Sequence, residues 1–282
     1  MFYPPPADAS NEPPAGEGLT KYFSKDPHYI PYRGRLFHFF WPLTRYVITN
    51  TCAVLAWVYL YILNKTVVIG KQNASQEPNT LLLPNHQTML DGFLVGVAAF
   101  YPKCFIKPSL FPWIPAAYEN FYNNPFLAWF SDNWKCIPIR LGRKDYAAMR
   151  RMVRCLPGGH MIIFPEGTRS RDGRILPPRL GTGYLICETR PRVIPVCMDG
   201  MDKVLPVGSK APRIGRTVFL YFGKPVDLAR FYDLAPCRET YEAIMNEIFI
   251  QIKRQHGILT RYRRYRRHLT AKKPFWRRLY AP

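Results

Sequence analysis

This sequence predicts an α/β domain whose sheet is mixed, largely parallel and flanked by helices, preceded by an N-terminal membrane-embedded helical segment. Short apolar runs typical of strands recur between Val67 and Phe222, and helical stretches lie between several of them. A nearly continuous apolar stretch from Tyr46 to Leu63 predicts the embedded segment. The chain has 282 residues, 48% of them apolar, so it is long enough to bury a large core.

The N-terminal part of the chain divides into two predicted segments. Residues 1–30 are predicted to be disordered, because they are rich in proline and polar groups and lack an apolar signal-peptide core. Residues 31–64 form the membrane-associated helical segment. Its apolar stretch of about eighteen residues is short for a spanning helix and contains Thr49, Asn50 and Thr51. This favours a pair of helices lying in one leaflet, with a spanning helix or a core helix of a soluble domain as alternatives.

Residues 65–259 form the predicted α/β domain. Its strands are expected at Val67–Ile69, Thr80–Leu83, Cys104–Ile106, Cys136–Ile139, Met161–Phe164, Val193–Val196 and Val218–Phe222. Helices are expected at Asp145–Leu156 and Gly181–Glu188, and a last helix from about Arg238 to Gln255 carries an apolar stripe on one face. The alternation of strands and helices is typical of a largely parallel sheet.

A histidine and a carboxylate, His86 and Asp91, come just after the predicted strand Thr80–Leu83, which Pro84 ends. Active sites of open α/β sheets collect at such strand-to-helix turns. Five positions correspond to roughly 140° around a helix, so the two side chains can meet only if His86 lies at or before the first helical turn. Since histidine oriented by a carboxylate can act as a general base, an enzyme is the leading hypothesis.

A second polar cluster, Phe164-Pro165-Glu166-Gly167-Thr168-Arg169-Ser170, follows the predicted strand that begins at Met161. Arg169 has a planar guanidinium that can hold phosphate oxygens bidentately, and Gly167 lets the backbone approach a ligand closely. The hydroxyls of Thr168 and Ser170 add hydrogen-bonding groups. The cluster therefore favours a ligand that carries a phosphate, with a charged surface turn as the alternative.

Together, Asn85-His86-Gln87-Thr88-Met89-Leu90-Asp91 and the second cluster resemble the two main motifs of the glycerolipid acyltransferase family, most closely of its 1-acyl-sn-glycerol-3-phosphate acyltransferases. Ile137-Pro138-Ile139-Arg140 and Val193-Ile194-Pro195-Val196 look like the family's intermediate and final blocks. The resemblance implies a membrane-associated enzyme that moves an acyl group from acyl-CoA or acyl-carrier protein to the sn-2 hydroxyl of lysophosphatidic acid, giving phosphatidic acid. Glycerol 3-phosphate or another lysophospholipid stays open as the acceptor.

The resemblance also implies roles for single residues. His86 is the expected base, and Asp91 holds its ring and stabilises the imidazolium that forms. The sequence has no Gly-x-Ser-x-Gly elbow, which favours direct attack by the acceptor over an acyl-enzyme, with backbone amides after His86 as oxyanion donors. The expected acceptor site consists of Glu166, Gly167, Thr168, Arg169, Arg140 and Lys107.

In that acceptor site, Arg169 is expected to pair with the phosphate, and Glu166 to position the glycerol or, alternatively, to pair with Arg169. Arg140 and Lys107 are further cationic candidates, with ordinary surface charge as their alternative. The acyl donor is a co-substrate and no cofactor is expected. No metal is expected either, because the remaining histidines and the seven scattered cysteines show no ligand spacing. The cysteine pattern also gives no disulfide framework, so a reducing cytoplasmic setting fits best.

The formal net charge of +21 indicates an anionic partner, which can be nucleic acid, anionic lipid or the acidic carrier of an acyl group. Residues 260–282 form a tail in which arginines and lysines are interleaved with aromatic residues. An anionic membrane surface is the expected partner of this tail, and nucleic acid is the less favoured one. We expect the chain at a membrane, on the cytoplasmic face of the inner or plasma membrane. The competing hypothesis is a non-enzymatic basic protein that binds nucleic acid or membrane.

Overall fold

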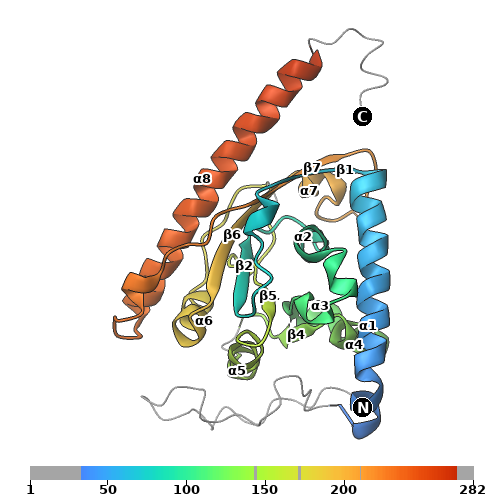
Figure 1. The fold of residues 1–282 in the computed structure, drawn as a ribbon, viewed down its shortest axis with the longest axis vertical. Coiled ribbons are helices and arrows are strands. Elements are labelled where there is room, and N and C mark those ends of the chain that lie inside the picture. The colour runs from blue at the N-terminus through green and yellow to red at the C-terminus, as the bar shows by residue number, and fades with distance from the viewer. Residues whose placement is uncertain (1–32, 143–144, 171–172, 210, 272–282) are drawn as a thin grey trace.

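The computed structural model describes residues 33–142, 145–170, 173–209 and 211–271. The segment 1–30, for which disorder is predicted, lies outside the described residues, as does the end of the basic tail from Lys272 onward. A central sheet with helices on both faces makes up the body of the protein, and one long helix, α1 (Arg35–Trp57), runs along its edge (Figure 1).

The main sheet has five strands, in the order β1 (Lys65–Ile69), β7 (Thr217–Phe222), β6 (Arg192–Asp199), β2 (Thr80–Pro84) and β5 (His160–Ile162). Neighbouring strands run parallel except β6 and β7, which are antiparallel. The predicted mixed, largely parallel sheet is therefore confirmed. β2 lies between β6 and β5 and is buried along its whole length, as expected for a strand covered on both faces.

A second, two-stranded parallel sheet pairs β3 (Ile114–Ala117) with β4 (Cys136–Ile139). It continues the main sheet, because Trp113, just before β3, pairs in parallel with Met161 of β5. The carboxyl ends of β2, β4 and β5 consequently lie at the same edge. The sequence did not predict β3, whose Ile-Pro-Ala-Ala sequence has little of the β-branched character typical of strands.

The strand predicted at Cys104–Ile106 is wrong. A 3₁₀ turn, Lys103–Phe105, follows α2 (Asp91–Phe100), and a second one follows at Pro108–Leu110. Proline stands at positions 102 and 108, on both sides of the short apolar run, and proline cannot donate a hydrogen bond to a neighbouring strand. Ile106 is 93% exposed instead of buried in a sheet.

The remaining α-helices are α3 (Tyr118–Phe121), α4 (Pro125–Asn133), α5 (Tyr146–Cys155), α6 (Gly181–Thr189), α7 (Met201–Val204) and α8 (Arg238–Ala271). α5 and α6 agree with the predicted helices to within one residue at each end. α2 packs on one face of the sheet, where Leu82 of β2 joins its core cluster. α5, α6 and α8 pack on the other face, where Leu81 and Leu83 point.

α8 is longer than predicted, because it continues past Gln255 to Ala271 and takes in the first part of the basic tail. Leu259 is fully buried, and Arg263 donates from Nη1 to both carboxylate oxygens of Asp199, at 3.0 and 2.7 Å. These contacts hold the extension against the carboxyl end of β6. The apolar stripe used for the prediction ends before them, so periodicity alone placed the helix end too early.

α1 continues through a π-helical turn, Val58–Leu63, so residues 35–63 form one continuous helix. The predicted pair of helices is therefore wrong. The polar residues that suggested a break bond back to the helix itself: the Thr49 hydroxyl donates to the carbonyl of Arg45 at 2.7 Å, and Asn50 Nδ2 donates to the carbonyl of Tyr46 at 2.8 Å. Both side chains are buried against the domain, so the helix continues through them.

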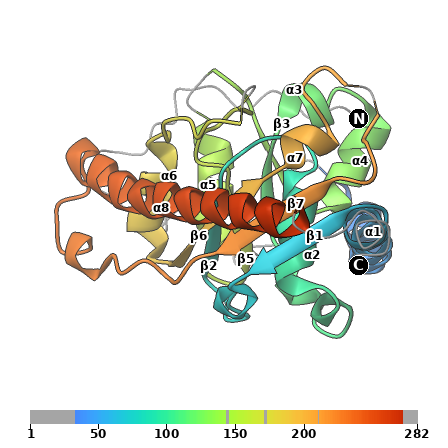
Figure 2. The same ribbon diagram turned by 90° about the horizontal axis from the view of Figure 1, so that it is seen from above.

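One face of this helix packs against the domain, and the opposite face is apolar and exposed. Trp41, Ala53 and Leu60 lie on the buried face. The exposed face presents Leu36, Phe39, Phe40, Leu43, Val47, Leu55 and Ile62. Among the described residues, Arg35–Leu63 is the one helix long and apolar enough to cross a membrane, judged by length and composition. Figure 2, which looks along α1, shows the rest of the molecule to one side of it.

Candidate active site

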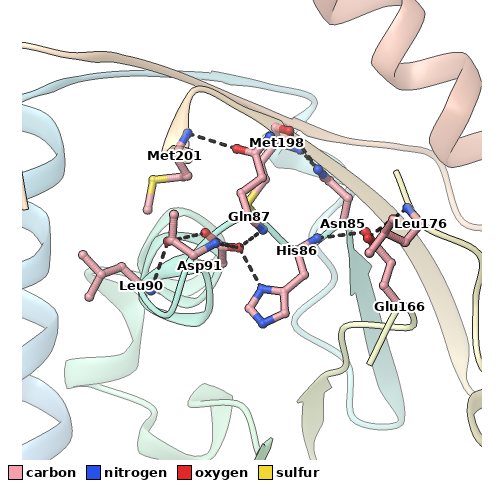
Figure 3. A network of polar contacts seen from close by, with 10 residues as sticks. Asn85, His86, Gln87, Leu90, Asp91, Glu166, Leu176, Met198 and Met201 are labelled. Carbon is pink, nitrogen blue, oxygen red and sulfur yellow. Dashed lines mark hydrogen bonds and ion pairs between the residues drawn. The ribbon is translucent and has the colours of Figure 1, made fainter. Parts of the chain in front are cut away.

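His86 lies in the loop between β2 and α2, at the carboxyl edge of the sheet (Figure 3). β2 ends at Pro84 and α2 begins at Asp91, so His86 precedes the first helical turn, as the five-residue spacing requires. Its Nδ1 lies 2.9 Å from Asp91 Oδ2. The loop thus brings together the two side chains that the sequence singled out.

The Asp91 carboxylate is fully buried and accepts hydrogen bonds from its own loop. Besides His86, the amides of Gln87 and Thr88 donate to Oδ2 at 2.5 and 2.8 Å, and the Thr88 hydroxyl donates to Oδ1 at 2.7 Å. These donors offset the loss of water around the charge and fix its position. Thr88 is a positioning residue that the sequence analysis missed, although its place three residues before an acidic residue at a helix start is a capping-type pattern.

The His86 ring is held on one side and open on the other. Because Asp91 accepts the hydrogen on Nδ1, the second ring nitrogen, Nε2, carries the lone pair of the neutral imidazole. The ring stacks on Phe164, with 4.0 Å between ring centroids and 22° between ring planes. The His86 side chain is 18% exposed while Asp91 is completely buried. A hydroxyl can therefore reach Nε2 and give up its proton there.

Two buried amide side chains tie the His86 loop to β6 and α7. Asn85 exchanges two hydrogen bonds with the backbone of Met198: its Nδ2 donates at 3.1 Å and its Oδ1 accepts at 2.7 Å. Gln87 Oε1 accepts from the amide of Met201 at 3.0 Å. Buried polar groups with satisfied partners favour one arrangement of a loop, so His86 stands on a fixed backbone. Because Asn85 and Gln87 flank His86 directly, their position in the sequence is the feature from which a structural role could have been predicted.

Glu166 connects the second motif to the first through the backbone. It is 3% exposed, and its Oε1 and Oε2 accept from the amides of His86 and Leu176 at 2.9 and 3.0 Å. Burial raises the pKa of the Glu166 carboxyl, while these two amides act in the opposite direction. Within the described residues the carboxylate pairs with amides and not with Arg169, so the alternative of a Glu166–Arg169 ion pair is wrong. The contact of Glu166 with glycerol stays a prediction.

The rest of the second motif forms a turn after β5, beside His86, because the Ser170 amide donates to the His86 carbonyl at 2.9 Å. Gly167 has a φ of +64°, which glycine adopts without strain. The Arg179 side chain fills the space next to this glycine: its Nε lies 2.5 Å from where a Cβ would stand. Arg179 therefore lies close to the backbone of Gly167, where the sequence predicts the approach of a ligand.

Arg169 lies in this turn, and Arg179 lies against its Gly167. Thr168 is exposed and Arg169 is half-buried, and the structure gives Arg169 no hydrogen-bond or ion-pair partner among the described residues. Arg179, which lies against Gly167, is exposed. No role was predicted for Arg179, because one basic residue after the second motif does not stand out among forty lysines and arginines. Within the described residues neither guanidinium has an ion-pair partner, and both belong to segments beside the His86 loop.

Arg140 follows β4 at the same edge of the sheet as His86. Its guanidinium lies over the Tyr118 ring, 5.1 Å from the centroid, and its backbone amide donates to Asp145 Oδ2 at 3.0 Å. The side chain is half-buried. The structure therefore places Arg140 at the correct edge for an acceptor contact, which stays a prediction.

Lys107 lies elsewhere. It is near His160, whose pKa is lowered to about 4 by burial, with Lys135 and Lys107 acting in the same direction. His160 begins β5, whereas His86 follows the end of the neighbouring parallel strand, so the two histidines lie at opposite edges of the sheet. Lys107 therefore lies toward the opposite edge of the sheet from His86, and its contact with the acceptor stays a prediction.

The amides after His86, expected to bind the oxyanion, are largely used within the loop. Those of Gln87 and Thr88 donate to Asp91 Oδ2, and that of Leu90 donates to the Thr88 hydroxyl oxygen at 3.1 Å. These three amides are therefore not free to stabilise a reacting oxygen. Arg169 of the second motif is the other source of positive charge in this region, because the turn that carries it adjoins His86.

Comparison with known proteins gives a consistent result. Residues 65–199 match the model of the family described as Acyltransferase. The chloroplastic 1-acyl-sn-glycerol-3-phosphate acyltransferase BAT2 of Brassica napus is 26% identical over 176 residues, which is 61% of this chain and 48% of that protein. Taffazin of Dictyostelium discoideum is 31% identical over 157 residues, 52% of this chain and 54% of that protein. The chain thus spans about half the length of the curated relatives it matches.

The fold is similar to a solved structure. The crystal structure of PlsC, the 1-acyl-sn-glycerophosphate acyltransferase of Thermotoga maritima, superposes with a TM-score of 0.58 at 22% sequence identity. The similarity covers 83% of this chain and 85% of that chain. It extends beyond the residues that the family model matches, so the fold is shared over most of the described chain.

Proposed function

This chain belongs to the glycerolipid acyltransferase family, and on that premise we propose that it moves an acyl group from a thioester to the sn-2 hydroxyl of lysophosphatidic acid, giving phosphatidic acid. The observation that carries the proposal is the His86–Asp91 pair, with one imidazole nitrogen held by a buried carboxylate and the other open. The thioester is acyl-CoA or acyl-carrier protein, and acts as a co-substrate.

The reaction follows from this geometry. His86 Nε2 takes the proton of the acceptor hydroxyl while the oxygen attacks the thioester carbonyl, and Asp91 stabilises the imidazolium. The tetrahedral intermediate then expels the thiolate, which receives the proton back from Nε2, so the acyl ester and a free thiol are the products. Arg169 and Arg179 are the proposed partners of the acceptor phosphate, because Arg169 belongs to the turn that adjoins His86 and Arg179 lies against Gly167 of that turn.

We assign Glu166 a positioning role in this reaction, because its carboxylate fixes the His86 amide and the Leu176 amide at the same time. Other groups at the carboxyl edge of the sheet must then contact the glycerol. Arg140 is a further candidate for contact with the acceptor. A larger lysophospholipid is the second candidate acceptor, favoured by the similarity to Taffazin, which is not named for lysophosphatidic acid.

We also propose that the protein acts at a membrane, with α1 lying in one leaflet. The support is the exposed apolar face of α1, opposite a face that packs on the domain. All seven cysteines are free, which fits a reducing compartment and hence the cytoplasmic side of the membrane.

The test of the proposed reaction uses purified protein in detergent or liposomes, with acyl-CoA and acyl-carrier protein as donors and lysophosphatidic acid, glycerol 3-phosphate and lysophosphatidylcholine as acceptors. The parent protein should form phosphatidic acid, and His86→Ala should lose about 10³-fold in turnover while binding liposomes equally. If product forms only from another acceptor, that acceptor is the substrate and the proposal for lysophosphatidic acid is wrong. No product with any pair, together with nucleic-acid binding, would support the non-enzymatic alternative.

A further inference from the structure

Two loops that are far apart in the sequence share an unusual pattern of exposure. In the first, Ile106 is 93% exposed and lies between the exposed Lys103 and Lys107. In the second, Ile214 is 62% exposed and lies between the exposed Arg213 and Arg216. A large apolar side chain displayed between cations has no function in packing, and neither loop belongs to the site around His86.

Both loops are held by tyrosine hydroxyls of the continuous helix 35–63, which consists of α1 and the π-helical turn after it. Tyr46 donates to the Phe105 carbonyl at 3.2 Å, and Tyr59 donates to the Arg213 carbonyl at 2.5 Å. The second loop is held once more, because the Gly215 amide donates to the Leu63 carbonyl at 2.8 Å. In Figure 2 the loop after α2 and the loop between α7 and β7 lie on opposite flanks of α1.

The apolar face of α1 lies between these two loops. Phe39, Leu43 and Leu55 are 76%, 64% and 63% exposed on it. The three elements together present a long apolar strip bordered by cations. We propose that α1 and these two loops form one docking surface for a membrane leaflet that contains anionic lipids, in which the isoleucines enter the interface and the four cations contact lipid phosphates. The proposal rests on the membrane association proposed above and identifies the surface responsible.

Charge identifies the occupant of this surface. Positive residues border the strip on both flanks and the whole chain carries a formal charge of +21, so a second copy of the chain would meet like charge here. Anionic lipid gains free energy from each cation near its surface and takes up exposed apolar side chains at the same time. A leaflet meets both requirements at once.

The spacing of the two loops also fixes how α1 lies. Tyr46 and Tyr59 are thirteen positions apart, which corresponds to roughly 20 Å along a helix. The hydrocarbon core of a bilayer is about 30 Å thick, so a helix standing upright would place at least one pair of cations in hydrocarbon. With the helix axis parallel to the surface, both pairs reach the head groups.

The test measures partitioning of the full-length protein onto vesicles of phosphatidylcholine, with and without phosphatidylglycerol. The variants are Lys103→Gln with Lys107→Gln, Arg213→Gln with Arg216→Gln, and the single changes Ile106→Ser and Ile214→Ser. The matched controls are Lys253→Gln and Leu234→Ser, exposed residues of α8 and of the segment before it. Each charge pair should lower partitioning onto anionic vesicles about tenfold and change it little on neutral ones.

The two isoleucine changes should lower partitioning on both kinds of vesicle, by about tenfold each, and the controls should change neither. Equal melting temperatures of variants and parent exclude misfolding as the cause. If the loop variants match the controls while Leu43→Ser loses binding, this docking surface is wrong and association through α1 stands. If the parent does not partition at all, both the surface and the proposed membrane association are wrong.

Discussion

The loop around His86 and the outer face of α1 satisfy opposite physical requirements. At the carboxyl edge of the sheet, the polar side chains Asn85, Gln87, Asp91 and Glu166 are buried, and each is bonded to a backbone amide or carbonyl. On α1, large apolar side chains face outward without protein neighbours to cover them. The first region is complete by itself, whereas the second presents the apolar face that we propose contacts a membrane. Catalytic geometry and membrane contact are therefore separable in this protein.

Asp91→Asn is the strongest test of that separation. The amide keeps the size of the side chain but presents an NH₂ group to donors, so the His86 tautomer is no longer fixed and the imidazolium loses its counter-charge. We expect turnover to fall about 10³-fold, measured as phosphatidic acid formed per enzyme, with KM for the acceptor nearly unchanged.

Vesicle partitioning of Asp91→Asn should equal that of the parent. Ile106→Ser is the matched control: it should lower vesicle partitioning and leave turnover in detergent unchanged. If Asp91→Asn loses membrane binding together with turnover, the two regions are coupled and the comparison fails.

Lys135 lies where α1 meets the domain and sharpens the comparison. It is buried, its Nζ donates to the Phe111 carbonyl, and it lies 4.9 Å from the centroid of Trp113, a ring that packs near Trp41 of α1. Burial lowers the pKa of Lys135 to about 7, and the nearby Arg45 adds to the effect.

Because this pKa is below that of an unfolded lysine, about 10.4, the unfolded chain binds the proton more tightly than the folded one between about pH 7 and 10. The unfolding free energy of the parent should therefore rise with pH across this window. Lys135→Met removes this contribution. Between about pH 7 and pH 10, measured by urea titration, the unfolding free energy of the variant should therefore rise by on the order of 3 kcal/mol less than that of the parent. Parallel pH profiles for the two proteins would refute the assignment.

Glu166→Gln should give the smallest effect. Glutamine keeps one acceptor oxygen but turns an NH₂ group toward the other backbone amide, so we expect a loss of about 1–3 kcal/mol in unfolding free energy. Since burial raises the pKa of Glu166, the parent loses stability as pH rises through the range of that carboxyl. The difference in unfolding free energy between parent and variant should thus narrow as the pH rises above the pKa of an unfolded glutamate, about 4.3, and a constant difference would contradict the prediction.

The effect on catalysis distinguishes positioning from direct binding by Glu166. A positioning role predicts that Glu166→Gln lowers kcat with little change in KM for the acceptor, since the His86 backbone shifts but the phosphate partners stay. A direct contact with glycerol predicts a raised KM instead.

Sequence reasoning succeeded where a local pattern controls the structure. The apolar runs at Val67 and Val218 form neighbouring strands, and the five-residue spacing of His86 and Asp91 requires the strand-loop-helix arrangement that is present. Periodicity also located α5 and α6. These features depend on neighbours in the chain, which the sequence displays directly.

It failed where tertiary contacts decide. The role of Glu166 depends on an amide eighty positions away in the chain, and no local pattern shows that contact. The extension of α8 past Gln255 is held by the ion pair of Arg263 with Asp199. The location of Lys107 depends on the prolines that interrupt the apolar run around it. Resemblance to a family gave predicted roles for Glu166 and Lys107 but did not show which residues surround them.

The hydrogen bonds around His86 have a consequence for how the protein folds. Asn85 bonds to Met198 and Gln87 to Met201, residues more than a hundred positions further along, and β2 pairs in parallel with strands that come much later in the chain. Closing such long loops costs entropy before the contacts form, and parallel pairing of distant strands is slow. We expect the helices to form early and the loop that orders His86 to be completed late. On refolding, the return of enzymatic turnover should therefore lag behind the return of helical signal.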